Sequence, residues 1–315
     1  MPHRPARPFS RAVGASFVFA IFAPVAPAQS WNADPPAPTV MFGVDGDLLT
    51  SNAQGLIGFD ELLGRTLLPL AGGWSPLPSS VPPRVSSTLV ATGVNTFVFG
   101  GLDATSNAPR NDLWMWNVPT ADWLQLSPGG ATAPGPGPRF GVEAAPWDDG
   151  WSLVFFGGAD TSGVLDETWA MLQVTTLIVP PIWVLQTTPP ALVGRTGHCM
   201  ARAPGEQVVM FGGDNGGALG DTWLYDPIAG WAQHTGVGPP AASGCRMAYD
   251  RGRDMTVLVH PNGETWEWNG IRWRRVGATG GPTWSQPAVA FAPTSQWSGE
   301  VVAVQQDATG TVTWR

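Results

Sequence analysis

One phrase recurs along the chain and constrains its fold more than any single residue does. An apolar run ends in a Gly pair, a polar loop follows, and an acidic residue then stands two places before a Trp. The second Gly of the pair falls at Gly101, Gly158 and Gly213, so the interval is about 55 residues. A leading Arg and a first Trp recur at similar intervals, at Arg84, Arg139, Arg195 and Arg246, and at Trp114, Trp169, Trp223 and Trp266. Self-similarity of this kind is typical of repeat architectures.

Each unit contains the pattern of four short strands. The unit from Arg195 predicts strands over 195–203, 207–211, 222–226 and 231–234, separated by Gly- and Pro-rich turns. In the unit from Arg246, the pair Asn269-Gly270 predicts a two-residue type I′ hairpin turn between Trp268 and Ile271, because both residues tolerate positive φ. A four-stranded sheet with two apolar faces cannot bury both alone, whereas radial stacking of several sheets buries each against its neighbours.

The repeated phrase resembles the kelch motif, in which a Gly pair closes an apolar strand and an aromatic and a spaced Trp follow. The resemblance covers roughly Pro38 to Arg315 and implies a β-propeller. Four units begin at the leading Arg residues, a degenerate unit (38–83) precedes them, and a truncated unit (281–315) follows. We therefore expect an all-β fold, a single β-propeller of six four-stranded kelch-like blades. Five blades remain open as the alternative if the first unit is not a blade.

The ends of the chain carry two further expectations. Residues 1–28 resemble a secretory signal peptide, with three Arg residues, an apolar stretch over 12–25 and an A-x-A cleavage site at Ala26-Pro27-Ala28. The propeller then occupies 29–315, and the protein is exported to the periplasm or outside the cell. The last unit predicts three strands, and Trp31 is well placed to supply a fourth, so that the N-terminal strand of the mature chain closes the ring.

Charge and composition limit the partners. The formal net charge is −8, and it becomes more negative when the Arg-containing leader is removed. An acidic chain is a poor candidate for nucleic acid or an anionic membrane surface. After Ala28 no stretch is long and apolar enough to span a bilayer. Charged residues make up only 13% of the chain, while Gly and Pro are abundant, which favours short strands joined by turns.

The two cysteines, Cys199 and Cys245, lie near the start of neighbouring units. Neighbouring blades could bring them together, and an exported protein would permit a disulfide between them. Two isolated thiols are the other interpretation, because the sequence does not give the separation that a disulfide requires.

The leading Arg residues are the candidate ligand-binding set. Each begins an innermost strand, so a ring of guanidiniums at the central opening could hold a carboxylate, a phosphate or an acidic sugar in a bidentate manner. The alternative is structural, in which each Arg pairs with a backbone carbonyl or an acid of the propeller. The set comprises Arg84, Arg139, Arg195 and Arg246.

Other polar residues also recur once per unit. Acids precede the first Trp or follow the Gly pair, and turn capping or Arg–acid pairing explains them better than a Ca²⁺ site, since one acid per blade is spread around a ring. These acids are Asp112, Glu167, Asp221 and Glu264, and Asp103, Asp160 and Asp214. His198, Ser87 and Tyr249 each follow a leading Arg by three places, which favours packing over catalysis. His260 stands where other units have the Gly pair.

No catalytic constellation, cofactor or metal site emerges from these residues. A galactose-oxidase-like copper site needs two His, two Tyr and a cross-linked Cys, and the two Tyr of this chain do not partner a Cys in that way. Gly263-Glu264-Thr265-Trp266 matches only the ending of a sialidase Asp box. We expect a non-enzymatic binding or scaffold module that recognises a protein or a glycan through face loops. The alternative is a propeller enzyme, galactose-oxidase-like or glycan-active, with a site in a central pocket.

Overall fold

The computed structural model describes nine stretches of the chain and shows an almost entirely β architecture. These stretches are 47–52, 55–70, 73–93, 95–148, 152–172, 181–276, 288–292, 300–307 and 310–314. Within them the strands form a series of antiparallel sheets, and the helical structure is one short 3-10 turn, η1 (Val118–Thr120). The leader and Trp31, and with them the expected closing N-terminal strand, lie outside the described residues.

Five of the sheets have four strands each, and we number them as blades along the chain. Blade 1 comprises β1 (Asp47–Asn52), β2 (Gly55–Asp60), β3 (Arg65–Leu70) and β4 (Gly73–Pro78). Blade 2 comprises β6 (Thr88–Ala91), β7 (Thr96–Phe99), β9 (Leu113–Asn117) and β10 (Asp122–Ser127). Blade 3 comprises β11 (Glu143–Pro146), β12 (Leu153–Phe156), β15 (Thr168–Leu172) and β16 (Ile182–Gln186).

The second half of the chain continues this order. Blade 4 comprises β17 (Cys199–Ala203), β18 (Gln207–Phe211), β19 (Thr222–Asp226) and β20 (Gly230–His234). Blade 5 comprises β21 (Arg246–Asp250), β22 (Met255–Val259), β23 (Thr265–Trp268) and β24 (Trp273–Val276). Blade 6 has three described strands, β25 (Ala288–Ala292), β26 (Glu300–Asp307) and β27 (Gly310–Trp314). Short pairs form at the loops, β5 (Arg84–Val85) with β8 (Leu102–Asp103), and β13 (Ala159–Asp160) with β14 (Gly163–Val164).

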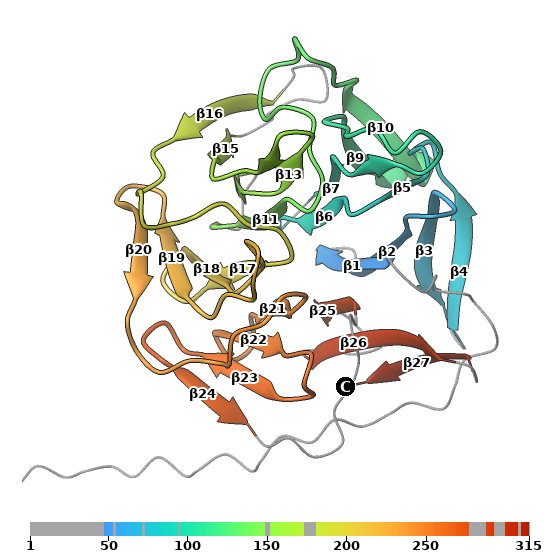
Figure 1. Cartoon of the computed structure of the whole chain (residues 1–315). Helices are drawn as coiled ribbons and strands as arrows, with labels where there is room; N and C mark the ends of the chain where they lie inside the picture. Colours follow the sequence, from blue (N-terminus) through green and yellow to red (C-terminus); the bar gives the residue numbers. More distant parts are fainter. Residues whose placement is uncertain are drawn as a thin grey trace, which may run out of the picture.

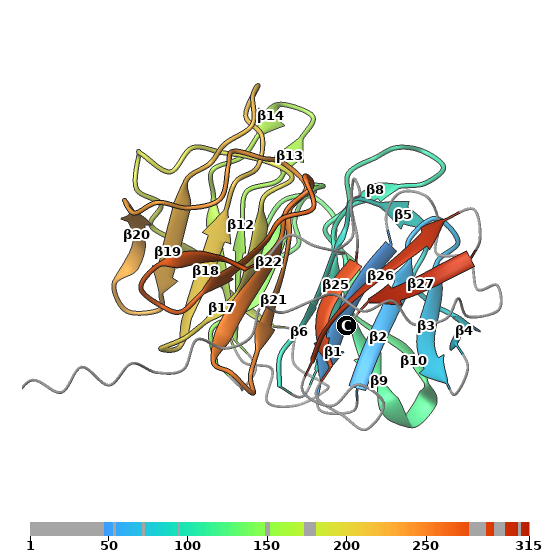
Figure 2. The same ribbon diagram turned by 90° about the horizontal axis from the view of Figure 1, so that it is seen from below.

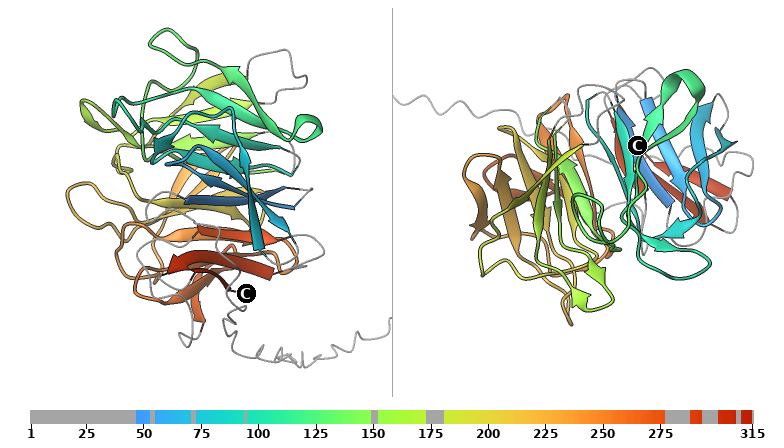
Figure 3. Two further views of the ribbon diagram at one scale, coloured as in Figure 1. Left: turned by 90° about the vertical axis from the view of Figure 1, so that its right-hand side faces the viewer. Right: turned by 90° about the horizontal axis from the view of Figure 1, so that it is seen from above.

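The sheets are arranged radially and the ring is closed. The first strand of every blade is innermost, and β1, β6, β11, β17, β21 and β25 contact one another in that cyclic order, with β25 returning to β1 (Figure 1). The side views show the ring as a squat body with the strands steeply inclined to its plane (Figures 2 and 3). The predicted all-β propeller is therefore confirmed. Because the second strand leads to the third at one end of each blade, these connections share one face of the ring, which we call the loop face.

One predicted turn is wrong in detail. The hairpin between β23 and β24 forms, but Trp268 pairs with Trp273, so four residues make the turn instead of two. Gly270 has a φ of 87°, whereas Asn269 does not adopt positive φ. Its side-chain Oδ1 accepts hydrogen bonds from the backbone N–H groups of Ile271 (3.1 Å) and Arg272 (2.9 Å). Asn269 therefore acts as an Asx-turn acceptor, a role that a sequence pattern does not separate from the type I′ role.

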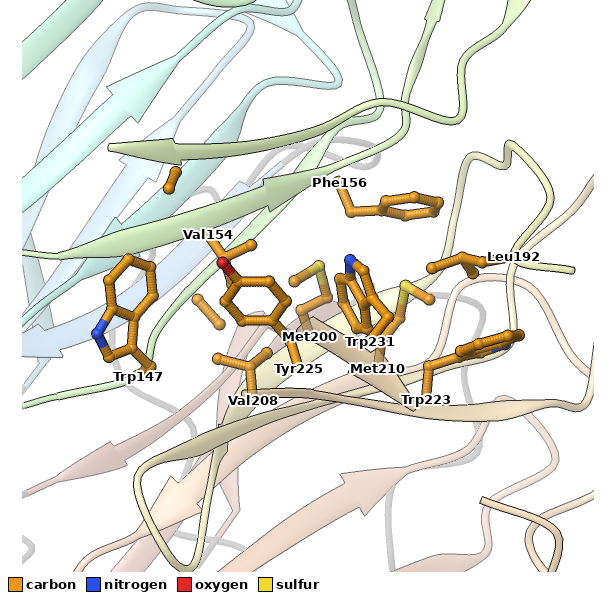
Figure 4. Close-up of a cluster of buried hydrophobic side chains, with 12 residues drawn as sticks. Trp147, Val154, Phe156, Leu192, Met200, Val208, Met210, Trp223, Tyr225 and Trp231 are labelled. Atoms are coloured by element: carbon orange, nitrogen blue, oxygen red, sulfur yellow. The ribbon is translucent and has the colours of Figure 1, made fainter. Parts of the chain in front are cut away.

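Aromatic and aliphatic side chains fill the space between adjacent blades. Figure 4 shows one such cluster, in which Val154 and Phe156 of blade 3 face Met200, Met210 and Trp231 of blade 4. The Phe156 and Trp231 rings meet edge to face with centroids 5.6 Å apart, a preferred aromatic geometry. Similar clusters lie between blades 2 and 3 and between blades 4 and 5. The described Trp side chains thus act as wedges between blades, as their spacing predicted.

A repeated hydrogen bond joins neighbouring blades at the buried Trp of the outermost strand. The indole Nε1–H of this Trp donates to a Thr hydroxyl at or near the start of the third strand of the preceding blade. The pairs are Trp123 to Thr66 (2.7 Å), Trp231 to Thr168 (2.9 Å) and Trp273 to Thr222 (3.0 Å). Because each indole is buried, this hydrogen bond satisfies an N–H donor that water cannot reach. It also fixes the orientation of the Trp side chain between the two blades.

Replacing Thr222 by Val should destabilise the propeller. The change keeps the side-chain shape but leaves the buried Trp273 indole N–H without its acceptor, so we expect a loss of about 1–3 kcal/mol in the free energy of unfolding. Urea unfolding monitored by Trp fluorescence measures it. Thr161→Val, at an exposed loop position, is the matched control and should stay within about 0.5 kcal/mol of the wild type. Equal effects of the two changes would contradict a stabilising role for the indole–hydroxyl bond.

Candidate functional site: the loop face and the ring axis

A buried arginine clamps each of three successive blades beneath the loop face. In blade 2 the Arg84 guanidinium donates to both carboxylate oxygens of Asp112, at 2.8 and 2.9 Å. It also donates to the carbonyl oxygens of Gly100 (2.9 Å) and Pro82 (3.1 Å). The Arg84 side chain is 0% exposed, so every contact is made inside the protein. The arrangement ties the segment leading into the innermost strand to the loop between the second and third strands.

Blades 3 and 4 repeat the clamp. Arg139 donates to Glu167 (2.6 Å) and to the Gly157 carbonyl (3.2 Å). Arg195 donates to Asp221 (2.6 and 2.8 Å) and to the Gly212 carbonyl (3.0 Å). In all three blades the indole N–H of the first Trp donates to the same acid two residues earlier, at 2.6–2.9 Å; these residues are Trp114, Trp169 and Trp223. Arginine, acid and Trp thus form one hydrogen-bonded unit per blade, which we call the clamp.

The Gly pair belongs to the clamp through its backbone. Gly100 and Gly101 both have positive φ, 68° and 92°, a region that residues with a Cβ rarely adopt. A Cβ on Gly100 would lie 2.9 Å from the carbonyl oxygen of Arg139 in the next blade. The N–H of Gly101 donates to that carbonyl at 2.9 Å. The glycine pair therefore allows the loop of one blade to approach the leading segment of the next.

In blades 3 and 4 the clamp lowers the pKa of its acid. Burial by itself raises the pKa of Asp221, but hydrogen bonds from Arg195 and Trp223 outweigh it and the net shift is downward. The pKa of Glu167 shifts downward in the same way, with burial opposed by hydrogen bonds from Trp169 and Arg139. Both carboxylates are therefore held in the charged form that pairs with the guanidinium.

These contacts give the predicted ligand-binding set a structural explanation in three of its four positions. Arg84, Arg139 and Arg195 are buried, and their donors are engaged by acids and carbonyls of their own blades. A ligand at the centre of the ring would have to displace a buried ion pair to reach them, which is costly. The geometry favours the structural alternative for these three residues.

Arg246 does not occupy the clamp position in blade 5. The carbonyl of the clamp arginine accepts from the second Gly of the preceding blade, as Arg139 and Arg195 do from Gly101 and Gly158. In blade 5 the equivalent acceptor is Ala242, which receives the N–H of Gly213 at 2.9 Å. Arg246 therefore stands four places later, as the first residue of β21, and its place in the repeated Arg series is wrong.

His260 takes over part of the missing clamp in blade 5. In blades 2 to 4 the arginine Nε–H donates to the carbonyl two residues earlier. The corresponding carbonyl in blade 5, that of Pro240, bonds His260 Nε2 at 3.1 Å. The Asn262 N–H donates to His260 Nδ1 at 3.1 Å, which is consistent with a proton on Nε2. Glu264 still accepts from the Trp266 indole (3.0 Å) and pairs with Arg275 (3.0 Å), so His260 has a structural position.

Arg246 instead meets Glu143 inside the ring. Glu143 begins β11 and Arg246 begins β21, and their charged groups lie 4.0 Å apart. In the ring, β17 lies between β11 and β21. The Glu143 and Arg246 side chains therefore meet on the side of β17 that faces the ring axis. The two side chains are 28% and 23% exposed, so this pair, unlike the Arg84–Asp112 pair of blade 2, is reached by solvent. Burial raises the pKa of Glu143 to about 7, and the Arg246 charge opposes that rise.

Acidic residues organise the tips of the loops, as predicted for turn caps. Asp103 accepts from the backbone N–H of Thr105 (3.0 Å) and of Ser106 (2.7 Å), and pairs with Arg110. Hydrogen bonds from Ser106 and Arg110 lower the pKa of Asp103. Asp160 accepts from Ser162 N–H at 2.7 Å, and Asp214 accepts from Gly216 N–H at 3.0 Å. Each loop between the second and third strands of blades 2 to 4 is thus fixed at its base by the clamp and near its tip by an Asp.

The other predicted candidates are not brought together. His198 is buried between blades 3 and 4, with its ring 5.6 Å from that of Phe156, and burial lowers its pKa to about 3. Tyr249 lies further along β21 and donates to Asp254 at 2.5 Å. By register, the equivalent of His198 in blade 5 is Cys245 and not Tyr249, so that predicted equivalence is wrong. Within the described stretches no group of three or more His, Cys, Asp or Glu is placed to hold a metal ion.

The sequence did not indicate the role of two acidic residues. Glu143 carries no repeat marker, because Thr88, Cys199 and Arg246 occupy its position in other blades. Glu61, in the turn after β2, accepts from the N–H groups of Ser86 (3.2 Å) and Ser87 (2.6 Å) and from the Ser87 hydroxyl. Ser87, weighed as a catalytic position, is thus a partner in the contact between blades 1 and 2. The degenerate first unit lacks the Gly pair that would have placed Glu61 at this loop.

Comparison with known proteins agrees with this geometry. The fold and clamps define a propeller with a repeated glycine-pair and Trp signature, and residues 73–258 match the family described as the KLHDC2/KLHL20/DRC7 Kelch-repeats domain. The match extends over more than half of the chain, and the protein belongs to the kelch-repeat family. In the described residues no helix is long and apolar enough to cross a membrane.

Two curated relatives share part of the chain. The F-box/kelch-repeat protein At1g51550 of Arabidopsis thaliana is 29% identical over 160 residues, which is 49% of this chain and 33% of the relative. Tip elongation aberrant protein 1 of Schizosaccharomyces pombe is 31% identical over 153 residues, which is 45% of this chain and 12% of the relative. The matched part thus spans a third or less of the length of either relative.

Removing the arginine of a clamp should cost more than removing an exposed arginine. Arg84→Met removes the bidentate partner of the buried Asp112 and leaves it only the longer ion pair with Arg110 at 3.8 Å, so we expect a loss of about 3–5 kcal/mol in the free energy of unfolding. Arg275→Met, which breaks the pair with Glu264 from a side chain 53% exposed, should cost less than about 1 kcal/mol. Chemical denaturation of both variants gives the comparison. Adding Asp112→Leu to Arg84→Met should restore part of the loss, and a further loss would contradict the buried-charge explanation.

The raised pKa of Glu143 predicts a pH-dependent difference between wild type and Glu143→Gln. An acid whose folded-state pKa is about 7, against 4.5 unfolded, binds more protons in the folded state across that range. Wild-type stability therefore falls, through this group, as pH rises from 4.5 to about 7, and is level above it. Glu143→Gln has no such proton, so it should become more stable relative to wild type across the same interval. Thermal unfolding at half-unit pH steps measures this, and a constant difference would contradict the assignment.

Proposed function

We propose that the protein is an exported, non-enzymatic binding module that recognises a partner protein through the loop face of blades 2 to 4. The kelch-repeat fold supports a protein-binding scaffold as the general class. The choice of face and the type of partner come from the geometry of the loops. Export is inferred from the Arg-containing, apolar and A-x-A features of residues 1–28.

The main support for this proposal is that contacts within the protein already fix three neighbouring loops on this face. Clamps hold the bases of the loops that follow Gly101, Gly158 and Gly213. Asp103, Asp160 and Asp214 each accept backbone N–H groups of their own loop. Binding to a prearranged surface avoids much of the entropy that ordering flexible loops would cost. The buried arginines of the clamps thus serve to position the loops of this face.

The chemistry of the loop face favours a protein over a glycan. Apolar side chains stand exposed on it among Gly, Ser and Thr, and exposed apolar groups rimmed by polar ones are typical of protein contact sites. In blades 2 to 4 they include Val164 in β14 and Val193 before the blade 4 clamp, and Leu62 and Leu63 extend them onto the neighbouring blade 1. A glycan as the partner is the alternative outcome of the experiment.

An enzymatic role is not supported by the positions of the reactive side chains. His198 is sealed between blades, His260 replaces a clamp contact, and Tyr249 donates to Asp254. Their present contacts are structural, and they come from separate parts of blades 4 and 5. We therefore infer binding without chemistry, in place of a galactose-oxidase-like or glycan-active site.

Substituting one residue on each face tests the proposal. Partners are selected by displaying a protein library against the immobilised full chain, and a glycan array is probed in parallel. Val164→Arg places a charge on the loop face, and we expect affinity for a selected protein to fall at least about tenfold. Ile228→Arg, in the β19–β20 turn at the opposite face, is the control, since Ile228 is 96% exposed and binding should be unchanged.

Two results would overturn the proposal. Loss of binding with Ile228→Arg but not with Val164→Arg would move the site to the opposite face. Saturable binding to glycans, with no protein selected, would replace the protein partner by a carbohydrate. Circular dichroism of both variants checks that neither change unfolds the propeller.

A further inference from the structure

The junction between blades 4 and 5 holds both cysteines of the chain. Cys199 is the first residue of β17 and Cys245 immediately precedes β21. Both are free thiols in the structure, both are buried, and both belong to the apolar cluster between these blades. The Cys199 thiol lies 3.6 Å from the carbonyl oxygen of Phe211 in its own blade, and the nearby Cys245 thiol adds to the rise in the pKa of Cys199 that burial causes. The two thiols are therefore neighbours within one buried cluster.

The backbone explains why these two side chains meet. The N–H of Gly244 donates to the carbonyl of Gly197 at 2.7 Å, which holds the leading segments of the two blades side by side. An equivalent backbone hydrogen bond joins blades 2 and 3, where the Gly141 N–H donates to the Ser86 carbonyl at 2.8 Å. At that junction the positions of the two cysteines are occupied by Thr88 and Val142.

We propose that Cys199 and Cys245 form a disulfide bond that staples blade 4 to blade 5 in the exported protein. Two S–H bonds break and one S–S bond forms. The two electrons and two protons pass to a disulfide oxidant, such as an oxidised thiol–disulfide oxidoreductase, whose own disulfide becomes two thiols. In the cell this step rests on the proposed export, because oxidising compartments are where such bonds persist.

The staple lies where the repeated clamp is missing. Blade 5 has Ala242 in the position of the clamp arginine, so its leading segment lacks the buried arginine and its ion pair that blades 2 to 4 have. A covalent bond three residues later in the same segment, at Cys245, anchors it to β17 instead. Two side-chain contacts of blade 5, that of His260 with the Pro240 carbonyl and that of Arg275 with Glu264, replace other parts of the clamp.

Burial of the two thiols determines when the disulfide can form during folding. Desolvation, and then the contact with Cys245, raise the pKa of Cys199, so little thiolate exists once the blades have closed. Oxidation therefore occurs before closure, during folding. After closure the bond is shielded from reductants and should resist them until the propeller unfolds.

Thiol counting by mass tests the bond directly. The full chain is refolded with glutathione disulfide and glutathione, unfolded without reductant, alkylated with iodoacetamide and weighed. We expect no added carbamidomethyl group, and two after reduction in denaturant. Reductant applied to the folded protein should leave the bond intact. Two alkylated thiols after oxidative refolding and unfolding without reductant would overturn the proposal.

Variants and a cellular arm complete the test. Cys199→Ser and Cys245→Ser should each show one alkylated thiol, and oxidised wild type should melt roughly 5–10 °C above reduced wild type. Equal melting temperatures would show that the bond does not staple the blades. The full chain expressed in a bacterium with a periplasm should be recovered oxidised. If the bond forms with glutathione but the cellular protein has free thiols, the proposed export fails while the disulfide geometry stands.

Discussion

A guanidinium that no water reaches must find all its partners within the protein, and this requirement organises the loop face. Arg84 and Arg195 are fully buried, so an acid and backbone carbonyls have to stand at fixed positions around each. The acid in turn fixes the Trp indole two residues later, and the Gly pair supplies the carbonyl. In each of blades 2 to 4, one buried charge thus holds the leading segment, a loop and a Trp side chain in fixed relative positions.

The sequence predicted most of the fold because the repeat markers are the structural contacts themselves. Trp223, Asp221 and Arg195 have equivalents at a nearly constant interval, because in every clamp the acid accepts hydrogen bonds from both the Arg and the Trp. Prediction failed where a blade departs from the pattern. Arg246 kept the interval approximately but stands four places after Ala242, the true equivalent, because sequence spacing does not show strand register. Contacts made once, such as that of Glu61 with Ser87, leave no repeated signal to find.

The sequence left two interpretations of the recurring Arg open for a related reason. A recurring Arg is compatible both with a ring of ligand-binding groups and with a repeated internal ion pair, and only burial separates the two. The acids two residues before each Trp were the informative signal, since an equal number of opposite charges at a fixed offset indicates pairing within the blade. Blade 5 shows that the fold tolerates losing the arginine when other contacts, those of His260 and Arg275, take over its carbonyl and its acid.

The central claim is that the clamps fix the loop face, and amide hydrogen exchange tests it most directly. The N–H groups of Gly101, Gly158 and Gly213 donate to the leading segment of the next blade beside each clamp. The account predicts that these three amides exchange as slowly as those of the central strands, and that Arg195→Met accelerates exchange around its own blade 4 loop while the blade 2 loop stays protected. Rapid exchange at all three glycines in the wild type would contradict it.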